Sequence, residues 1–292
     1  MCLIWGLPYL FIRVVVEDDH LTPGTLVFVR TGLGAAILLP IGLLRSQIKP
    51  VLVRWRWLVV FAVVEIMLPW LMLSDAERHL NSSLAGLLVA AVPLVGAVAA
   101  LFTHAAERLN RLQVVGLLLG IVGVACLVGL DFSGLHTSSL LEMAGVAVCY
   151  AIGPIILARS LSDLPGLGVI ACALAISAVA YSPFAFLQPP HHVTASVLGS
   201  VIVLGVVCTA LAFVLFFQLI ATIGPTRSTI ITYVNPAVAI ALGVLILDEK
   251  LTAGMLVGFP LILAGSILGA RKAKAKPEPI TEVDCAETVP AS

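Results

Sequence analysis

Charged residues are scarce in this sequence. Asp, Glu, Lys and Arg together make up 11% of the 292 residues, whereas 60% are hydrophobic and the mean hydropathy is +1.13. Soluble domains contain about a quarter charged residues, so the composition excludes a soluble globular protein and indicates a membrane protein. Helices fit better than a membrane barrel, because whole segments are apolar instead of alternating at every second residue.

Several catalytic and nucleotide-binding motifs are also missing. The sequence contains no GxxxxGK[ST] loop, no HExxH or GxSxG motif, and no pair of aspartates within an apolar run. An ATP-driven pump is therefore excluded for this chain alone. A membrane-embedded enzyme is the weaker alternative, and we do not expect an enzyme. The rings of repeated polar residues that line a channel are not evident either.

The cysteines show no paired spacing. The six cysteines lie mostly within apolar segments, where cysteine behaves as a small core residue. We therefore expect no disulfide framework, no metal site and no cofactor. The formal net charge is zero, and we expect no nucleic-acid partner.

Long apolar runs dominate what is present. As helices, runs of roughly 17 to 25 residues cross a bilayer core of about 30 Å, and the first run is only slightly shorter. The predicted fold is all-α and integral to the membrane, with ten transmembrane helices. Their approximate ranges are 1–16, 25–44, 57–73, 83–102, 114–130, 140–157, 167–187, 196–217, 226–247 and 253–270.

Basic residues predict the orientation of these helices. Twelve lysines and arginines fall in loops or in the tail on one side of the predicted membrane, against only Arg78 and Lys250 on the other. Because lysine and arginine are enriched in cytoplasmic loops, we expect a multi-pass protein of the cell (inner) membrane with both termini in the cytoplasm. Residues 271–292 are polar and contain proline, so we expect a disordered cytoplasmic tail there.

One phrase occurs twice in the sequence. Residues 90–109 read AAVPLVGAVAALFTHAAERL, and residues 233–251 read YVNPAVAIALGVLILDEKL. Two glycines follow each copy at the same spacing. The matching prolines and glutamates are Pro93 with Pro236 and Glu107 with Glu249.

This duplication predicts two homologous five-helix repeats, residues 1–130 and 140–270. Since five is odd, the second repeat enters the membrane from the opposite face, so the repeats are inverted. Inverted repeats favour alternating access, with a substrate site near the middle of the membrane where the two repeats meet.

Four further stretches carry a family resemblance. They are WGLPYLFIRV at 5–14, LTPGTLVFVRTGLGA at 21–35, GPTRSTIITYVNP at 224–236 and DEKLT at 248–252. Together with the duplicated phrase, they make residues 1–270 resemble the EamA-like family of the drug/metabolite transporter superfamily. The resemblance implies a ten-helix secondary transporter, many relatives of which export amino acids or other small metabolites.

We therefore expect an inner-membrane secondary transporter that exports small metabolites such as amino acids by alternating access. Its expected partners are a small-molecule substrate, the lipid bilayer and protons as a candidate coupling ion, and a homodimer is left open. The alternative is a flippase for a lipid-linked sugar or lipid, which a cavity open sideways to lipid would distinguish.

Aromatic and amide side chains within the predicted helices are candidates for substrate binding. Trp5 and Tyr9 are four residues apart and share one helix face, and Tyr150 is a further candidate for the cavity wall. Tyr233 and Asn235 lie deep in the ninth predicted helix, where an asparagine can both donate and accept hydrogen bonds. For these two residues, bonding to a neighbouring helix is the alternative.

The prolines of the duplicated phrase are candidate hinges. A proline inside a helix frees a carbonyl, which hydrocarbon tolerates only where protein or a wet cavity satisfies it. Pro93 and Pro236 are therefore expected to face protein or cavity, either as moving hinges or as packed structural kinks.

Three ionisable residues lie within predicted helices. Glu65 falls near the bilayer centre, so we expect it to be protonated or paired inside the bundle, either as a site for protons or a substrate amine or as a carboxyl bonded to a neighbouring helix. Arg13 and Arg30 lie closer to the outer ends of their helices, where they could extend to the interface, and they are candidate charge partners.

Other residues are assigned structural roles. Trp70 is expected in an aromatic belt at the interface, and Glu107 and Glu249 are expected to cap the helix that follows each of them. Glycines four residues apart predict close packing of the fifth and tenth helices against another helix, by default in the same chain. These are Gly116 with Gly120, Gly254 with Gly258 and Gly265 with Gly269.

Overall fold

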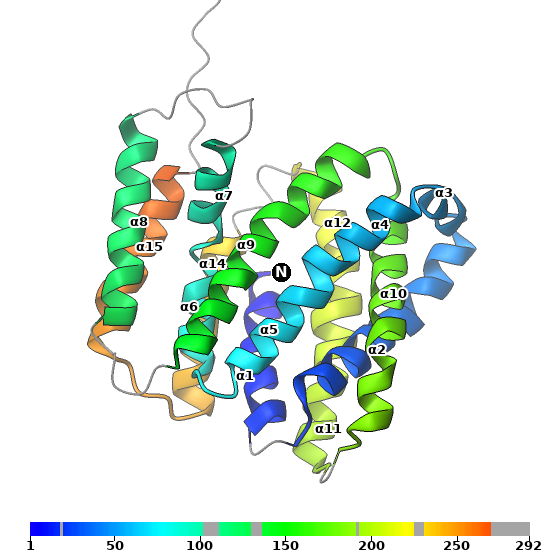
Figure 1. The fold of residues 1–292 in the computed structure, drawn as a ribbon, viewed down its shortest axis with the longest axis horizontal. Coiled ribbons are helices and arrows are strands. Elements are labelled where there is room, and N and C mark those ends of the chain that lie inside the picture. Colours follow the sequence, from blue (N-terminus) through cyan, green and yellow to red (C-terminus); the bar gives the residue numbers. More distant parts are fainter. Residues whose placement is uncertain (18–19, 102–110, 130–135, 191–192, 225–230, 270–292) are drawn as a thin grey trace, which may run out of the picture.

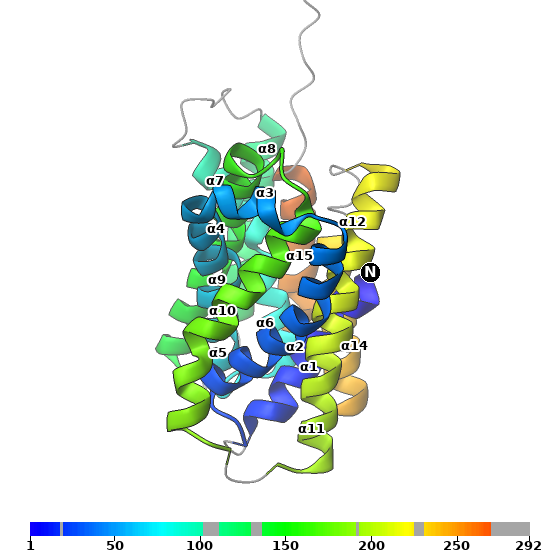
Figure 2. The same cartoon turned by 90° about the vertical axis from the view of Figure 1, so that its right-hand side faces the viewer.

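A computed structural model describes residues 1–17, 20–101, 111–129, 136–190, 193–224 and 231–269. Over these residues the chain is helical and contains no β-strand. The helices lie side by side in one bundle, and some cross their neighbours at an angle (Figures 1 and 2). The predicted all-α class is confirmed for this part of the chain.

The first half of the chain, residues 1–129, begins with the short helix α1. Its elements are α1 (Cys2–Val16), α2 (Pro23–Leu44), α3 (Ile48–Val53), α4 (Trp55–Phe61), the π-helical segment η2 (Ala62–Met67), α5 (Leu68–Ala76), α6 (Ser82–Val89), α7 (Val92–Leu101) and α8 (Arg111–Gly129).

The second half, residues 137–269, has a similar order of elements. They are α9 (Thr137–Ser160), α10 (Gly166–Leu187), α11 (Ala195–Ile202), the π-helical segment η3 (Val203–Leu211), α12 (Ala212–Ile223), α14 (Ile231–Ile246) and α15 (Ala253–Gly269).

Among the described residues, six helical stretches are long and apolar enough to cross a membrane. They are Pro23–Leu44, Trp55–Ala76, Arg111–Gly129, Thr137–Ser160, Gly166–Leu187 and Ala195–Ile223. Four shorter apolar helices lie in the remaining predicted ranges, and these are Cys2–Val16, Ser82–Gly96, Tyr233–Ile246 and Ala253–Leu268. The chain is therefore a multi-pass helical membrane protein.

Local sequence explains where several helices begin. Thr22, Asn81 and Thr194 stand just before α2, α6 and α11, and the side-chain oxygen of each accepts a hydrogen bond from the backbone N–H three residues later. Such residues satisfy N–H groups that the first helical turn leaves unpaired. The polar residues between the apolar runs thus set the helix starts.

Glycine sets the closest helix contact. A side chain at Gly265 of α15 would meet the Gly120 nitrogen of α8 at 2.5 Å and the Gly116 oxygen at 2.6 Å, and one at Gly258 would meet the Gly123 oxygen at 2.8 Å. The predicted close packing of the fifth and tenth helices is confirmed, and the partner of each is the other helix of the same chain. Figure 1 shows α8 and α15 together at one edge of the bundle.

Two clusters of buried apolar side chains form the core. One is built largely by α1, α6, α9 and α11, and the other by α2, α4, η2 and α10. Tyr150 of α9 packs against both clusters. The region between the clusters therefore lies around Tyr150.

Candidate functional site

Arg30 of α2 is the most unusual buried group near this region. Its side chain is only 6% exposed, and its guanidinium carbon lies 3.7 Å from the centre of the Trp70 ring on α5. Its Nε donates to Thr209 Oγ1 of η3 at 3.1 Å. The expectation that Arg30 extends to the interface is wrong, because Trp70 and Thr209 hold the guanidinium inside the bundle.

Trp70 also differs from its predicted role. It is buried beneath the Arg30 guanidinium instead of facing the interface as part of an aromatic belt. A cation over an aromatic face is stabilised most when both groups are removed from water. The indole and the guanidinium therefore hold each other in position.

Other ionisable groups surround Arg30. The groups that interact with it electrostatically are Cys208, Tyr150, Glu77 and Tyr9. Tyr9 in turn interacts with Tyr150 and Glu77, and Tyr150 interacts with Glu65 and the Trp70 side chain. The structure thus brings two predicted site residues, Tyr9 and Tyr150, close to Arg30, while Glu65 is a neighbour of Tyr150.

Glu77 follows the end of α5 and is fully buried. Neither of its carboxyl oxygens has a hydrogen-bond partner among the described residues. Removal from water, followed by repulsion from Glu249, raises the pKa of Glu77 well above its ordinary value, despite the opposing effect of Arg13 and Arg30. This favours the neutral form of the carboxyl.

Glu65 lies in the π-helical segment η2 and faces α9. A side chain at Gly153 would overlap its carboxyl group, and its Oε2 atom is buried without a hydrogen-bond partner in the described chain. In the described chain, this oxygen therefore makes no hydrogen bond to a neighbouring helix. The glycine on α9 leaves the space that the carboxyl fills.

Trp5 and Tyr9 contact different partners although they share a helix face. The Trp5 ring packs against Phe213 at a centroid distance of 5.9 Å and against Phe216 at 4.7 Å, both on α12. Tyr9 is buried beside Gly86 of α6. Trp5 therefore joins an aromatic contact between α1 and α12, apart from the partners of Arg30.

Tyr233 belongs to a chain of hydrogen bonds that ends near Pro93. Its hydroxyl donates to the Ser266 carbonyl at 3.4 Å, and the Ser266 hydroxyl donates to the Ala90 carbonyl at 3.0 Å. Ala90 lies at the break between α6 and α7, just before Pro93. A hydroxyl from α15 thus satisfies a carbonyl at this break, which fits a packed kink at Pro93.

Asn235 and Pro236 sit in α14 against α1. In the orientation that satisfies its hydrogen bonds, the Asn235 amide nitrogen donates to the Ile231 carbonyl at 2.9 Å and to the Cys2 carbonyl at 3.1 Å. Asn235 therefore makes the interhelical bond that was the alternative to ligand contact. Pro236 is buried, and α14 continues through it without the break that precedes Pro93.

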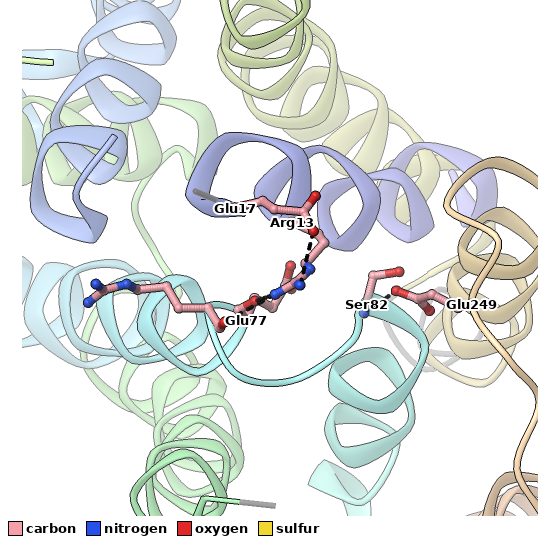
Figure 3. Close-up of polar contacts among 6 residues, drawn as sticks. Arg13, Glu17, Glu77, Ser82 and Glu249 are labelled. Carbon is pink, nitrogen blue, oxygen red and sulfur yellow. Dashed lines mark hydrogen bonds and ion pairs between the residues drawn. The ribbon is translucent and has the colours of Figure 1, made fainter. Parts of the chain in front are cut away.

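The ends of α1, α5 and α14 meet at a second polar cluster, which Figure 3 shows in close-up. Arg13 Nη1 donates to the carbonyls of Glu77 at 2.6 Å and Arg78 at 3.2 Å, and Nη2 donates to Glu17 Oε1 at 3.2 Å. Arg13 thus ties the end of α1 to the turn between α5 and α6.

Glu249 completes this second cluster. Its Oε1 accepts from the Ser82 N–H at 2.7 Å, and its Oε2 accepts from the Ser83 N–H at 3.0 Å and from the Ser83 hydroxyl. Glu249 thus caps a helix, as predicted, but the helix is not the one that follows it in sequence. Glu249 caps α6 in the other half of the chain, because Asp248 turns the backbone with a φ of 53°. Its counterpart Glu107 lies outside the described residues.

A cavity of about 280 Å³ lies where α2 begins and where α5, α9 and α10 approach it. Asp75 and Glu142 face it, and Asp75 pairs with Arg78 at 3.1 Å. In the described part of the chain, no group of three or more metal-binding side chains is close enough to hold an ion.

Sequence analysis does not single out Glu77 or Thr209. Glu77 lies in a charged stretch typical of an exposed loop, and Thr209 is one hydroxyl in a long apolar run. The usable signal for Thr209 is that a hydroxyl within a transmembrane helix needs a partner. Nothing in the sequence identifies Arg30 as that partner.

Comparison with known proteins names the family. The EamA-like transporter family matches residues 1–129 and again residues 137–270. The chain belongs to this family. The resemblance noted in the sequence is confirmed, and the protein is a transporter rather than an enzyme.

Individual relatives are distant but cover most of the chain. An uncharacterized transporter, YvbV of Bacillus subtilis, is 24% identical over 94% of this chain and 91% of that protein. Protein PecM of Dickeya dadantii is 24% identical over 97% and 95%. A probable amino-acid metabolite efflux pump of Salmonella typhimurium is 27% identical over 54% and 58%. A solved crystal structure shares the fold with a TM-score of 0.66 and 21% identity, covering 92% of this chain and 94% of that one.

Proposed function

We propose that this protein is a secondary transporter of the inner membrane that exports small metabolites such as amino acids by alternating access. The observation that carries the proposal is the polar region around Arg30. It is assembled from α1, α2 and α5 of the first half and from α9 and η3 of the second. A site built from both halves changes its exposure when one half rocks against the other.

The pairing of helices supports two inverted five-helix repeats. α8 packs against α15 and α2 packs against α10, so the fifth and second helices of each half contact their counterparts. The segment η2 contacts α9 and α10, while η3 contacts α1 and α2. This reciprocal pattern is what a two-fold axis between the halves produces, and an odd number of passes per half requires that axis to lie in the membrane plane. In this proposal, each half contributes five helices, and all ten helices cross the membrane.

Amino acids are the proposed substrates because one relative is described as a probable amino-acid metabolite efflux pump. Arg30 offers a buried cation, and Glu65, a neighbour of Tyr150, offers a carboxyl group that can release a proton. A zwitterionic substrate needs groups of both kinds.

Flux through vesicles tests the function. The purified protein is reconstituted in proteoliposomes and tested with a panel of labelled amino acids and related metabolites, with and without an imposed pH gradient. Flux above that of empty vesicles is expected. If no compound moves faster than through empty vesicles under either condition, transport of this class is contradicted.

Proton coupling is assigned to Glu65 in this proposal. Replacing Glu65 by Gln keeps the size of the side chain but removes its ability to release a proton. The Glu65→Gln variant should still exchange substrate at equal pH on both sides, while accumulation driven by a pH gradient should be lost. Full gradient-driven accumulation in the variant would remove Glu65 from the coupling mechanism.

Orientation is tested by labelling. Arg45 and Gln188 are exposed at opposite ends of the bundle, and the proposal places Arg45 in the cytoplasm. In a background without the native cysteines, a membrane-impermeant thiol reagent added to intact cells should label Gln188→Cys but not Arg45→Cys. The reverse labelling would contradict cytoplasmic termini.

A further inference from the structure

We propose that Arg30 binds a single carboxylate group of the transported molecule. This inference rests on the proposed transport function, and it adds the chemical group that the site recognises and the residue that recognises it.

The guanidinium has more donors than acceptors. Arginine carries five N–H donors, and in the described chain only the Nε donor is used, in the bond to Thr209 Oγ1. No described carboxylate lies within ion-pair distance of Arg30. The ion pairs of the described residues instead join Arg13 with Glu17, Arg54 with Asp163 and Arg78 with Asp75. The Nη edge of a buried arginine therefore lacks an acceptor.

A buried cation without a partner is costly, because it loses its hydration and gains no compensating charge. Among the described residues, Glu77 is the one carboxyl group that interacts electrostatically with Arg30. Its raised pKa favours the neutral form, so Glu77 is a poor counter-ion. The other ionisable neighbours, Tyr9, Tyr150 and Cys208, are neutral in their ordinary protonation states. The region around Arg30 thus has an unbalanced positive charge.

The guanidinium is also held in place before any ligand binds. Trp70 covers one of its faces, and Thr209 fixes Nε, while the Thr209 hydroxyl is itself held by a bond to the Leu204 carbonyl at 2.8 Å. A fixed planar guanidinium leaves its two Nη groups to pair with a planar carboxylate through two parallel hydrogen bonds. Fixing the donor in advance reduces the entropy lost on binding.

The charge balance favours one carboxylate over a phosphate. One guanidinium neutralises one negative charge, whereas a phosphate monoester carries between one and two. The described neighbours of Arg30 supply no second cation. Arg30 and Thr209 also come from different halves of the chain. A carboxylate bound here would therefore pair with a guanidinium that a residue of the other half holds in place.

Binding is measured by titration calorimetry on the purified full-length protein in detergent micelles, so that the result does not depend on transport. The probes are the standard L-amino acids, each paired with its α-carboxamide, together with inorganic phosphate. At least one amino acid should bind, and its carboxamide should bind about tenfold or more weakly, because it cannot form charge-assisted bonds. Equal binding of the two would overturn the proposal.

Matched variants locate the contact. Arg30→Lys keeps the charge but loses the planar pair of donors, and it should weaken amino-acid binding by about tenfold. Arg54→Lys changes an exposed arginine elsewhere and should leave binding unchanged. Unaltered affinity in Arg30→Lys contradicts the assignment. If that variant does not purify as a single species, the comparison of amino acid with carboxamide on the unchanged chain decides.

The remaining outcomes separate this inference from the proposed function. Absence of binding by every amino acid overturns the inference, whatever the vesicles transport. Binding of phosphate alone, lost in Arg30→Lys, overturns the assignment to carboxylate. Amino-acid binding that depends on Arg30, combined with no flux in vesicles, keeps the carboxylate site and rejects transport.

Discussion

Replacing Glu249 by Ala should destabilise the protein because Glu249 caps a helix in the other half of the chain. The change removes the acceptor of two backbone N–H groups and one hydroxyl, which belong to Ser82 and Ser83. Both serines are fully buried, so water cannot replace the lost bonds. Asn81 still caps the N–H of Leu84, so the start of α6 keeps one of its side-chain caps.

The expected size follows from these contacts. Loss of a helix cap costs about 0.5 to 2 kcal/mol, and a buried donor left without a partner costs about 1 to 3 kcal/mol. With Asn81 still in place, we expect Glu249→Ala to lower the free energy of unfolding by about 2 to 4 kcal/mol. Glu249→Gln keeps an acceptor oxygen but loses the charge and should cost about half as much.

Equilibrium unfolding in mixed micelles of mild detergent and dodecyl sulfate, followed by circular dichroism, measures this change. Glu17→Ala is the matched control at the same end of the bundle. The Glu17 side chain is 50% exposed and pairs with Arg13, and such exposed pairs contribute about 1 kcal/mol or less. If Glu249→Ala destabilises no more than Glu17→Ala, the cap between the two halves does not stabilise the fold.

Three further changes test other parts of the structure. Gly265→Leu should separate α15 from α8 and sharply reduce the yield of folded protein, whereas Gly199→Leu, at an open position, should not; equal yields on size-exclusion chromatography would contradict this packing. Burial raises the pKa of Glu77 in the folded protein, so stability should fall as pH rises above the ordinary glutamate pKa of about 4.3, and Glu77→Gln should flatten that dependence in unfolding curves. Asp248 has a positive φ of 53°, a conformation that glycine adopts more easily than residues with a Cβ. Asp248→Gly should therefore raise the unfolding midpoint, with a gain of up to about 1 kcal/mol. A lower midpoint would contradict a positive φ at this position.

Hydropathy and glycine spacing predict much of the architecture because they act locally. An apolar run of sufficient length forms a helix in lipid whatever its neighbours are, since its backbone polar groups must bond within the segment. The glycines of α8 and α15 likewise indicate close approach, because small residues are what let two backbones approach each other. These signals need no knowledge of which helices become neighbours.

The partner of each buried polar group, in contrast, depends on which helices become neighbours in the folded protein. The sequence places Trp70 near a helix end and Arg30 on another helix, but only the crossing of α2 with α5 stacks one on the other. In the same way, Glu249 precedes α15 in sequence, but in space its carboxylate reaches the start of α6.

By itself, the sequence determined that this is a helical membrane protein of the EamA-like transporter family, because composition, run length and motifs are properties of the chain alone. The tertiary structure decided which polar groups share the interior. A hydrophobic helix can turn any face toward its neighbours, and only packing against helices distant in sequence fixes the face that carries Arg30.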